Sequence, residues 1–304
     1  MTQLFQWARL SKSVRLALLA SAGVLAVGVA GAGLVPNGVN LQPSYYNGGN
    51  VNFGWTLMRA NPKIGSVRIE VEPGMEAQAA TWLAQARSNG LKAIVTYHKW
   101  TVLGSNSSYE LNQAADWWKR NYSKLRASGS FRVNLMNEWG DHNLSANDYA
   151  TAYNAAIATV RTVYKGPIVI DAPGWGQETA IAAAALKGYN GGVKITDTKV
   201  VPSMHVYPGA WNQAKNRWLN TSDVDDLASA GRGLIVGEFG SGGSGGADWV
   251  AITDYARSKG YSVLGWAWNG DGGFMNMVTP SWNDNPTATA FSKSSYWSTI
   301  YDRL

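Results

Sequence analysis

The sequence predicts an α/β fold, specifically a (β/α)8 TIM barrel in a single domain, and three observations lead to this prediction. Short runs of apolar and β-branched residues alternate with longer segments of helical period along the chain. These runs are almost unbroken in their apolar character, which is typical of parallel strands buried on both faces. Eight such runs can be counted after residue 32, and that number favours a closed barrel over an open doubly wound sheet.

The predicted elements follow one another with short connections. A helix over 75–87 lies between two strands, and Gly90 after it suits a helix C-terminus, where a left-handed residue is common. Ser145 and Asp148 have the spacing of a capping box at the start of another helix. The predicted strands are 38–42, 66–71, 91–98, 131–137, 167–172, 199–207, 233–239 and 261–268, and the predicted helices are 75–87, 109–125, 146–164, 179–186 and one opened by Asp248.

The glycine-rich stretch GSGGSGG, residues 240–246, has the composition of a linker. The residues after it contain only one clear strand, however, and could not form a core alone. The stretch also lacks the Lys and Ser/Thr of a phosphate-binding loop. We therefore expect a flexible loop at the top of the barrel and no domain boundary.

Residues 16–35 form an uninterrupted apolar stretch that follows Arg9, Lys12 and Arg15. Because 30–32 reads Ala-Gly-Ala, the form of a signal-peptidase site, we predict an export signal over 1–32, a catalytic domain over 33–304 and a secreted, extracellular protein. The alternative is an uncleaved membrane anchor, since twenty apolar residues can cross a bilayer. If the signal is cleaved, no stable membrane association is expected.

Charge and composition exclude several classes of function. The formal net charge is +6, three of these charges lie in the first fifteen residues, and the other cations are scattered among acidic residues without a basic run, so no nucleic-acid partner is expected. The absence of cysteine excludes disulfides and thiolate catalysis. With three histidines, the only weak metal candidate combines His98 and His205 with a carboxylate, and we predict neither a metal nor a cofactor.

The aromatic composition is unusual, with 15 Trp and 14 Tyr against 6 Phe. Trp and Tyr combine a flat apolar face with a polar edge, which suits half-hydrated surfaces. Sugar rings present flat C–H faces edged by hydroxyls, so this bias favours carbohydrate binding. The alternative is that many of these residues are simply large core side chains.

Polar and aromatic side chains stand at the C-terminal ends of the predicted strands, where the active sites of such barrels lie. Two of them, Glu138 and Glu238, come from strands on opposite sides of the barrel mouth. Paired carboxylates are the minimum equipment for cleaving a glycosidic bond, and a retaining enzyme needs them about 5–5.5 Å apart. The strand ends carry Arg68, His98, Asn137 with Glu138, Trp175, His205 with Tyr207, Glu238, and Trp266 with Trp268.

The other strand-end residues have expected supporting roles. Arg68 would keep a nearby carboxylate ionised, Tyr207 would donate a hydrogen bond to it, and Asn137 would hold the sugar 2-hydroxyl. His98 and His205 would form polar wall. Trp268, together with Trp266, would form a sugar platform.

These motifs resemble glycoside hydrolase family five, a family of retaining β-glycanases on (β/α)8 barrels. NLMNEWG resembles its acid/base motif after strand four and IVGEFG its nucleophile motif after strand seven, which implies Glu138 as acid/base and Glu238 as nucleophile. SMHVYPGAW resembles the His-x-Tyr of strand six, VRIEV the Arg of strand two and VTYH the His of strand three. Trp139 departs from the pattern, because many members have Pro after the acid/base.

The resemblance also implies a substrate. DAPGWGQE, LGWAWNGDGG and HVYPGAW look more like the endo-1,4-β-mannanase branches than the cellulases. We therefore expect hydrolysis of internal β-1,4 linkages of mannan, glucomannan or galactomannan by a monomer. An endo-1,4-β-glucanase is the alternative, and a non-catalytic carbohydrate-binding barrel is the alternative of another class.

Overall fold

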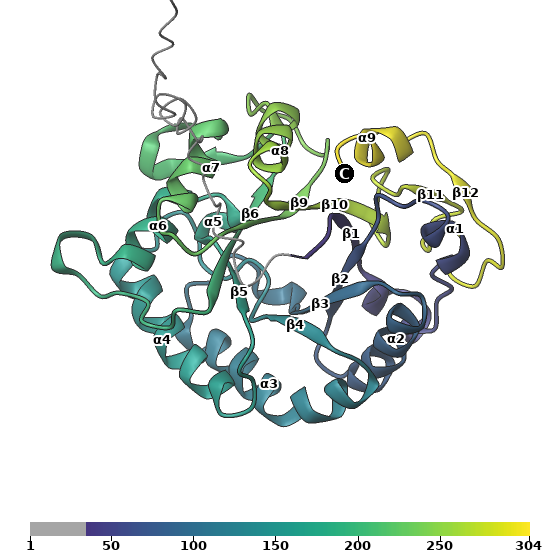
Figure 1. The fold of residues 1–304 in the computed structure, drawn as a ribbon, viewed down its shortest axis with the longest axis horizontal. Helices are drawn as coiled ribbons and strands as arrows, with labels where there is room; N and C mark the ends of the chain where they lie inside the picture. Colours follow the sequence, from purple (N-terminus) through teal and green to yellow (C-terminus); the bar gives the residue numbers. More distant parts are fainter. Residues whose placement is uncertain (1–34) are drawn as a thin grey trace, which may run out of the picture. The chain divides into compact units, whose positions relative to one another are not determined.

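A computed structural model describes residues 35–304 of the 304-residue chain. The predicted export signal, 1–32, lies outside these residues. Figure 1 shows a closed barrel of parallel strands surrounded by helices, which confirms the predicted fold class. Around the barrel the order is β1-β10-β9-β6-β5-β4-β3-β2. The strands are β1 Gly38–Leu41, β2 Ser66–Val71, β3 Lys92–Tyr97, β4 Phe131–Asn134, β5 Ile168–Asp171, β6 Val200–Val206, β9 Ile235–Phe239 and β10 Ser262–Asn269.

The helices cover the outside of the barrel and run antiparallel to the strands they connect (Figure 1). Gly90 has φ +75° after α2, and Gly90 and Leu91 donate their N–H groups to the carbonyls of Arg87 and Ala86, the paired bonds expected at such a helix end. The Ser145 hydroxyl caps α4 by accepting from Asp148 N–H. The helices are α1 Trp55–Arg59, α2 Glu76–Ser88, α3 Ser108–Ser128, α4 Ala146–Arg161, α5 Pro173–Gly176, α6 Thr179–Lys187, α7 Thr221–Ala228, α8 Trp249–Ser258 and α9 Trp297–Tyr301.

Several elements differ from the sequence prediction. The strand predicted over 131–137 ends at Asn134, since the chain leaves the sheet to reach the barrel mouth. The sequence did not predict α1, α5, α7 or α9, because each of them has only four to eight residues. It also missed the hairpins β7 Trp211–Asn212 with β8 Arg217–Trp218 and β11 Val278–Thr279 with β12 Ser292–Lys293. The 3₁₀ turns are η1 Pro43–Tyr45, η2 Asn47–Gly49, η3 Trp100–Val102, η4 Tyr189–Gly191 and η5 Gln213–Lys215.

The barrel interior has an apolar lower layer and a polar upper layer. Successive strand residues point to opposite faces, so every second residue enters the interior. Near the start of the strands, six buried apolar side chains form a separate core cluster. Toward the barrel mouth, the interior holds buried polar groups such as Arg68, Asn134 and Glu238. The lower layer consists of Val35, Ile94, Val169, Val201, Ile235 and Leu264.

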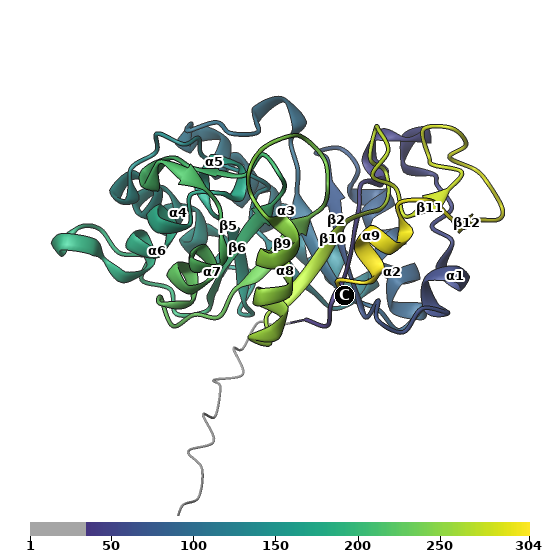
Figure 2. The same cartoon turned by 90° about the horizontal axis from the view of Figure 1, so that it is seen from above.

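The loops after the strands gather at one end of the barrel, seen at the top of Figure 2. The glycine-rich residues 240–246 connect β9 to α8 at this end, where the sequence places a barrel-top loop. Within residues 35–304, none of the helices combines the length and apolar character that crossing a bilayer requires.

Candidate active site

Glu138 lies beyond the end of β4 in a backbone conformation that is rare for residues other than glycine. Its φ is +48°, in the left-handed region, which costs an L-residue roughly 1 kcal/mol. Two hydrogen bonds hold this turn: Glu138 N–H donates to Asp171 Oδ2 at 3.0 Å, and Gly104 N–H donates to the Glu138 carbonyl at 2.8 Å. The carboxylate lies with its Oε1 2.8 Å from His205 Nδ1, and the side chain remains 13% exposed.

Glu238 belongs to β9 and is almost completely buried. Its Oε1 accepts from Arg68 Nη1 at 2.9 Å, and its Oε2 accepts from the Tyr207 hydroxyl at 2.8 Å. Burial alone would raise the pKa of Glu238. The positive charges of His205 and Arg68 and the Tyr207 hydrogen bond outweigh it and hold this pKa below its ordinary value.

Arg68 is the centre of the polar layer and has no exposed surface. Besides Glu238, its guanidinium donates to Glu70 Oε1 at 2.8 Å and to Asn134 Oδ1 at 3.0 Å. It also donates to Asn137 Oδ1, so the Asn137 amide is oriented with its NH2 group away from the arginine. This NH2 group is therefore available to a hydroxyl in the barrel mouth, as the sequence suggests.

The two predicted catalytic carboxylates lie close together. One oxygen of Glu138, one oxygen of Glu238 and a ring nitrogen of His205 all lie within 4.8 Å of one another. A gap of about 5–5.5 Å is typical of retaining glycosidases and one of about 6.5–9.5 Å of inverting ones, so this spacing corresponds to retention. The same three groups could ligate a metal ion, but the Arg68 guanidinium 2.9 Å from Glu238 disfavours a second cation there. His98 does not belong to this group.

His205 lies between the two carboxylates and is fully buried. Burial would lower the pKa of His205, but the charges of Glu238, Asp171 and Glu138 raise it to about 9. The imidazolium form therefore persists at neutral pH and donates Nδ1–H to Glu138. Its Nε2 lies 3.7 Å from Asp171 Oδ2 and has no hydrogen-bond partner among the described residues.

His98 directly follows β3 and is buried. Its Nε2 is 3.5 Å from Glu70 Oε2, and its Nδ1 is 2.5 Å from the Tyr45 hydroxyl and 3.3 Å from Glu72 Oε1. Burial would lower the pKa of His98, and the two carboxylates raise it. His98 thus contacts a second pair of acidic residues, with Tyr45 exposed beside it.

The three predicted sugar-binding tryptophans occupy different environments. Trp266 is 9% exposed, its indole N–H donates to Asp271 at 3.0 Å, and its backbone packs with Tyr207 around Gly240, two residues after Glu238. Trp175 is 36% exposed, and its indole covers Gly104, whose N–H holds the Glu138 carbonyl.

The prediction that Trp268 forms a sugar platform is wrong. Trp268 has no exposed surface, and its indole N–H donates to the Phe53 carbonyl at 2.7 Å. Its ring packs edge-on against Trp297 of α9. Trp268 is therefore a core residue between the barrel and its outer helices.

Three buried polar residues of the site were missed. Glu70 and Asn134 contact Arg68, and Asp171 accepts from Glu138 N–H and lies 3.6 Å from the arginine. A signal for Glu70 was present, because a residue two positions after Arg68 in a strand shares its face. Burial raises the pKa of Glu70 in spite of the nearby positive charges of His98 and Arg68.

Comparison with known proteins identifies the family. The family model described as Cellulase (glycosyl hydrolase family 5) matches residues 51–272. The chain belongs to glycosyl hydrolase family 5. All ten predicted site residues, the two catalytic carboxylates included, lie within the matched range.

Relatives within and around the family are similar over most of this chain. A mannan endo-1,4-beta-mannosidase of Streptomyces lividans is 31% identical over 216 residues, which cover 66% of this chain and 53% of that protein. The chain thus spans about half the length of this relative. The catalytic domain of a mannanase from Streptomyces sp. SirexAA-E has a TM-score of 0.68 at 21% identity, covering 89% of this chain and 85% of the other. An endoglucanase catalytic domain of Thermobifida fusca has a TM-score of 0.67 at 13% identity, covering 89% and 91%.

Proposed function

We propose that this family 5 protein is a retaining endo-1,4-β-mannanase that hydrolyses internal linkages of mannan, glucomannan or galactomannan. The observation that carries the proposal is the pair of carboxylates within 4.8 Å of each other, one of them buried against Arg68 and Tyr207. A carboxylate kept ionised beside a second carboxyl group is what double displacement at a sugar carbon requires.

In the first step, Glu238 attacks the anomeric carbon and the glycosidic oxygen leaves with a proton from Glu138. The Oε2 of Glu138 has no hydrogen-bond partner among the described residues, so it is the oxygen that can carry this proton to the leaving group. As the charge on Glu238 is consumed by bond formation, Arg68 keeps its contacts with Glu70 and Asp171. The arginine is therefore not left as an uncompensated buried charge.

In the second step, Glu138 accepts a proton from water, which attacks the glycosyl-enzyme and releases Glu238. His205 donates to Glu138 Oε1 at 2.8 Å and so orients the carboxylate that accepts this proton. The NH2 group of Asn137 is placed to bind the sugar 2-hydroxyl, whose contact strengthens toward the transition state. Trp266 and Trp175 are the two predicted sugar-binding tryptophans that keep some exposed surface.

The mannan substrate is supported by the Streptomyces lividans mannan endo-1,4-beta-mannosidase, which is 31% identical to the chain. The second candidate is an endo-1,4-β-glucanase with the same catalytic residues. It is supported by a protein of Caldicellulosiruptor saccharolyticus named Beta-mannanase/endoglucanase A, which is 28% identical over 240 residues, covering 74% of this chain and 17% of that protein. Initial rates on galactomannan, glucomannan, carboxymethylcellulose and β-glucan separate the two. Higher rates on carboxymethylcellulose than on both mannans would reject the mannanase.

A non-catalytic sugar-binding barrel is the alternative of another class. Replacing Glu138 or Glu238 by Gln is expected to lower turnover by about 10²–10⁴-fold, because each change removes one proton-transfer or nucleophilic group. Glu110→Gln is the matched control, since Glu110 pairs with Lys99 outside the carboxylate pair. Proton NMR of the first product should show the β-anomer. Binding of mannan without release of reducing sugar would favour the non-catalytic barrel.

We also propose that the protein is exported by its segment 1–32 and acts as a monomer on polysaccharide outside the cell. The apolar stretch with its Ala-Gly-Ala site supports the export. The N-terminal sequence of the protein recovered from culture medium tests it, and a first residue near 33 is expected. Recovery only from the membrane fraction with residues 1–32 intact would favour the anchor.

A further inference from the structure

The two ends of the barrel carry opposite charges. Because the helices run antiparallel to the strands, they begin at the barrel mouth and end at the opposite end, where the strands start. Acidic residues occupy the first turns of α2, α3, α4 and α7. Basic residues occupy the last turns of six helices, a placement that complements the helix dipoles. These helix-end cations are Arg59, Arg87, Arg126, Arg161, Lys187 and Arg257.

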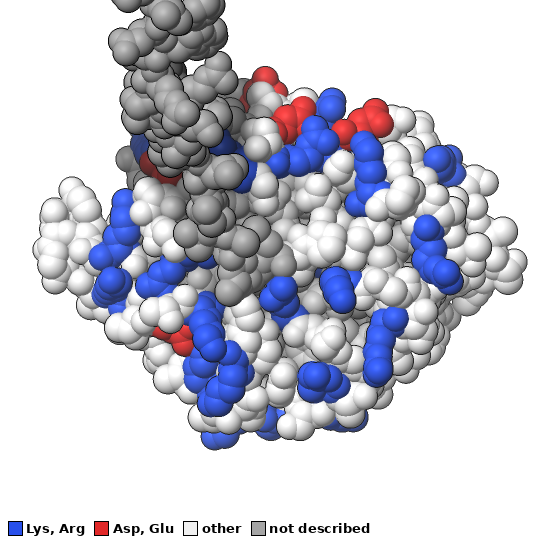
Figure 3. Space-filling view, in the orientation of Figure 1, with Lys and Arg blue, Asp and Glu red and all other residues white. Residues whose placement is uncertain are grey.

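A second set of cations at the same end lies beyond the last turns of the helices. These lysines lie in the loops that lead into the strands or at the first residue of a strand, and all are exposed. Figure 3 views the end where the strands begin, and Lys and Arg side chains are spread over it with few Asp or Glu between them. The second set consists of Lys63, Lys92, Lys165, Lys194, Lys199 and Lys259. We call the two sets together the basic face.

Few acidic groups neutralise the basic face. Among the described residues, its ion pairs are those of Arg161 with Asp197 at 2.5 Å and Arg257 with Asp254 at 3.2 Å. Cations at the barrel mouth are paired instead, as Lys99 is with Glu110 at 2.6 Å. The positive charge of the basic face is therefore directed to solvent and available to a partner.

The sequence expectation of scattered cations holds along the chain but not in space. Most strand–helix units contribute at least one cation at the same point of the repeat, and the barrel brings these points to one end. The absence of a basic run was thus a poor guide to the surface, because the fold collects charges that are tens of residues apart.

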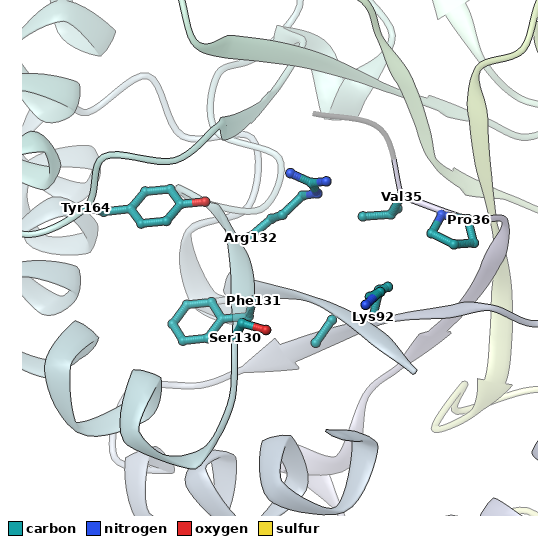
Figure 4. A pocket seen from close by; sticks show the side chains of 8 residues that line it. Val35, Pro36, Lys92, Ser130, Phe131, Arg132 and Tyr164 are labelled. Atoms are coloured by element: carbon teal, nitrogen blue, oxygen red, sulfur yellow. The ribbon is translucent and has the colours of Figure 1, made fainter. Parts of the chain in front are cut away.

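The described chain begins on the basic face. Val35 and Pro36 line a hollow there together with Lys92, Arg132 and Tyr164 (Figure 4). Val35 is also the last residue of the apolar stretch 16–35, so no spacer separates that stretch from the basic face. The catalytic carboxylates lie at the other end of the strands.

We propose that, as long as the segment 1–32 is attached, the basic face docks on the surface of an anionic phospholipid bilayer. Exposed lysines and arginines next to a segment of bilayer-spanning length are the arrangement that anionic headgroups attract. In this orientation the barrel mouth faces away from the lipid, toward a polymeric substrate. A nucleic acid would use the same charges, but it gives no reason for the apolar stretch to end at this face. The proposal does not depend on the proposed mannanase activity.

Vesicle flotation of the full chain tests the proposal. Vesicles of phosphatidylcholine alone are compared, at low and high salt, with vesicles that also contain phosphatidylglycerol. We expect at least about tenfold more binding to the anionic vesicles, lost at high salt. The apolar stretch can insert into both vesicles, so the difference between them is the readout. Lysine acetylation should slow at Lys92 and Lys199 on anionic vesicles and stay unchanged at Lys119 in the middle of α3.

Charge reversal supplies the matched comparison. Arg87→Glu with Lys92→Glu should remove most of the lipid-dependent difference, whereas Lys119→Glu with Arg120→Glu, which changes the net charge equally, should leave it. Circular dichroism establishes that both variants fold. Equal binding to the two vesicles, or an equal loss in both variants, would overturn the proposal. Tighter binding to duplex DNA than to anionic vesicles at equal phosphate would overturn it in favour of a nucleic acid.

Discussion

Replacing Tyr207 by Phe removes one hydroxyl from the site and no apolar contact. That hydroxyl donates to Glu238 Oε2 at 2.8 Å in a buried environment. A hydrogen bond to a charged group contributes about 1.5–3 kcal/mol, and one pKa unit corresponds to about 1.4 kcal/mol. The pKa of Glu238 should therefore rise by about 1–2 units, because the lost donor favoured the ionised carboxylate. The acid limb of kcat/KM against pH should move upward by the same amount.

The rate at the high-pH plateau should change less than the position of the acid limb. Glu238 loses its negative charge as it bonds to the sugar, so the Tyr207 hydrogen bond is weaker in the transition state than in the free enzyme. Initial rates on galactomannan across the pH range measure both quantities. Tyr255→Phe, which removes a hydroxyl that binds Asp225 on the outer helices, is the control and should leave the profile in place. An acid limb that stays within about 0.3 unit in Tyr207→Phe would refute the assigned role.

Further changes test the neighbours of this hydrogen bond. Glu70→Gln should shift the acid limb of kcat/KM downward, because it removes a negative charge that competes with Glu238 for the Arg68 guanidinium; an upward shift would contradict this geometry. Trp266→Ala should raise KM for mannan oligosaccharides about tenfold or more while the protein stays folded, whereas Trp268→Ala should cost about 3–5 kcal/mol in denaturant unfolding. The pKa of His205 is raised to about 9, so protonated His205 adds up to about 3 kcal/mol to the free energy of unfolding, in full below pH ~6.5. This contribution is lost as the pH rises through about 9. Denaturant unfolding below pH ~6.5 and above pH ~9 would detect the loss.

Strand-end residues were predictable because barrel geometry fixes where they go. Once eight parallel strands are expected, each C-terminal end must face the same mouth, and Glu138, Glu238, Arg68 and Tyr207 follow from position alone. Their mutual contacts are those that the predicted roles require. The chemistry of this site therefore depends on strand order more than on loop detail.

Other features were not predictable, because they depend on local irregularities of the strands or on residues that only the fold brings together. In a regular strand, side chains two residues apart share a face, so the sequence places Trp268 on the face of Trp266. The strand is not regular here, and Trp268 packs outside the barrel against Phe53 and Trp297. The direction of the Glu138 side chain depends on the left-handed backbone conformation of Glu138 itself, which no sequence pattern predicts. The basic face forms only because the barrel brings the ends of successive helices, which are far apart in the sequence, to one end of the molecule.

The two interior layers also set stability against catalysis. The lower layer is apolar, while the upper layer concentrates a guanidinium, carboxylates and amides that have no exposed surface. Exchanging a buried ionic cluster as a whole for apolar side chains of similar volume is often neutral or stabilising. A barrel whose upper layer was redesigned in this way could tolerate more heat than the natural one and would cleave nothing. Directed evolution for thermal endurance that is not also screened for turnover should accordingly drift toward inert scaffolds through substitutions around Arg68.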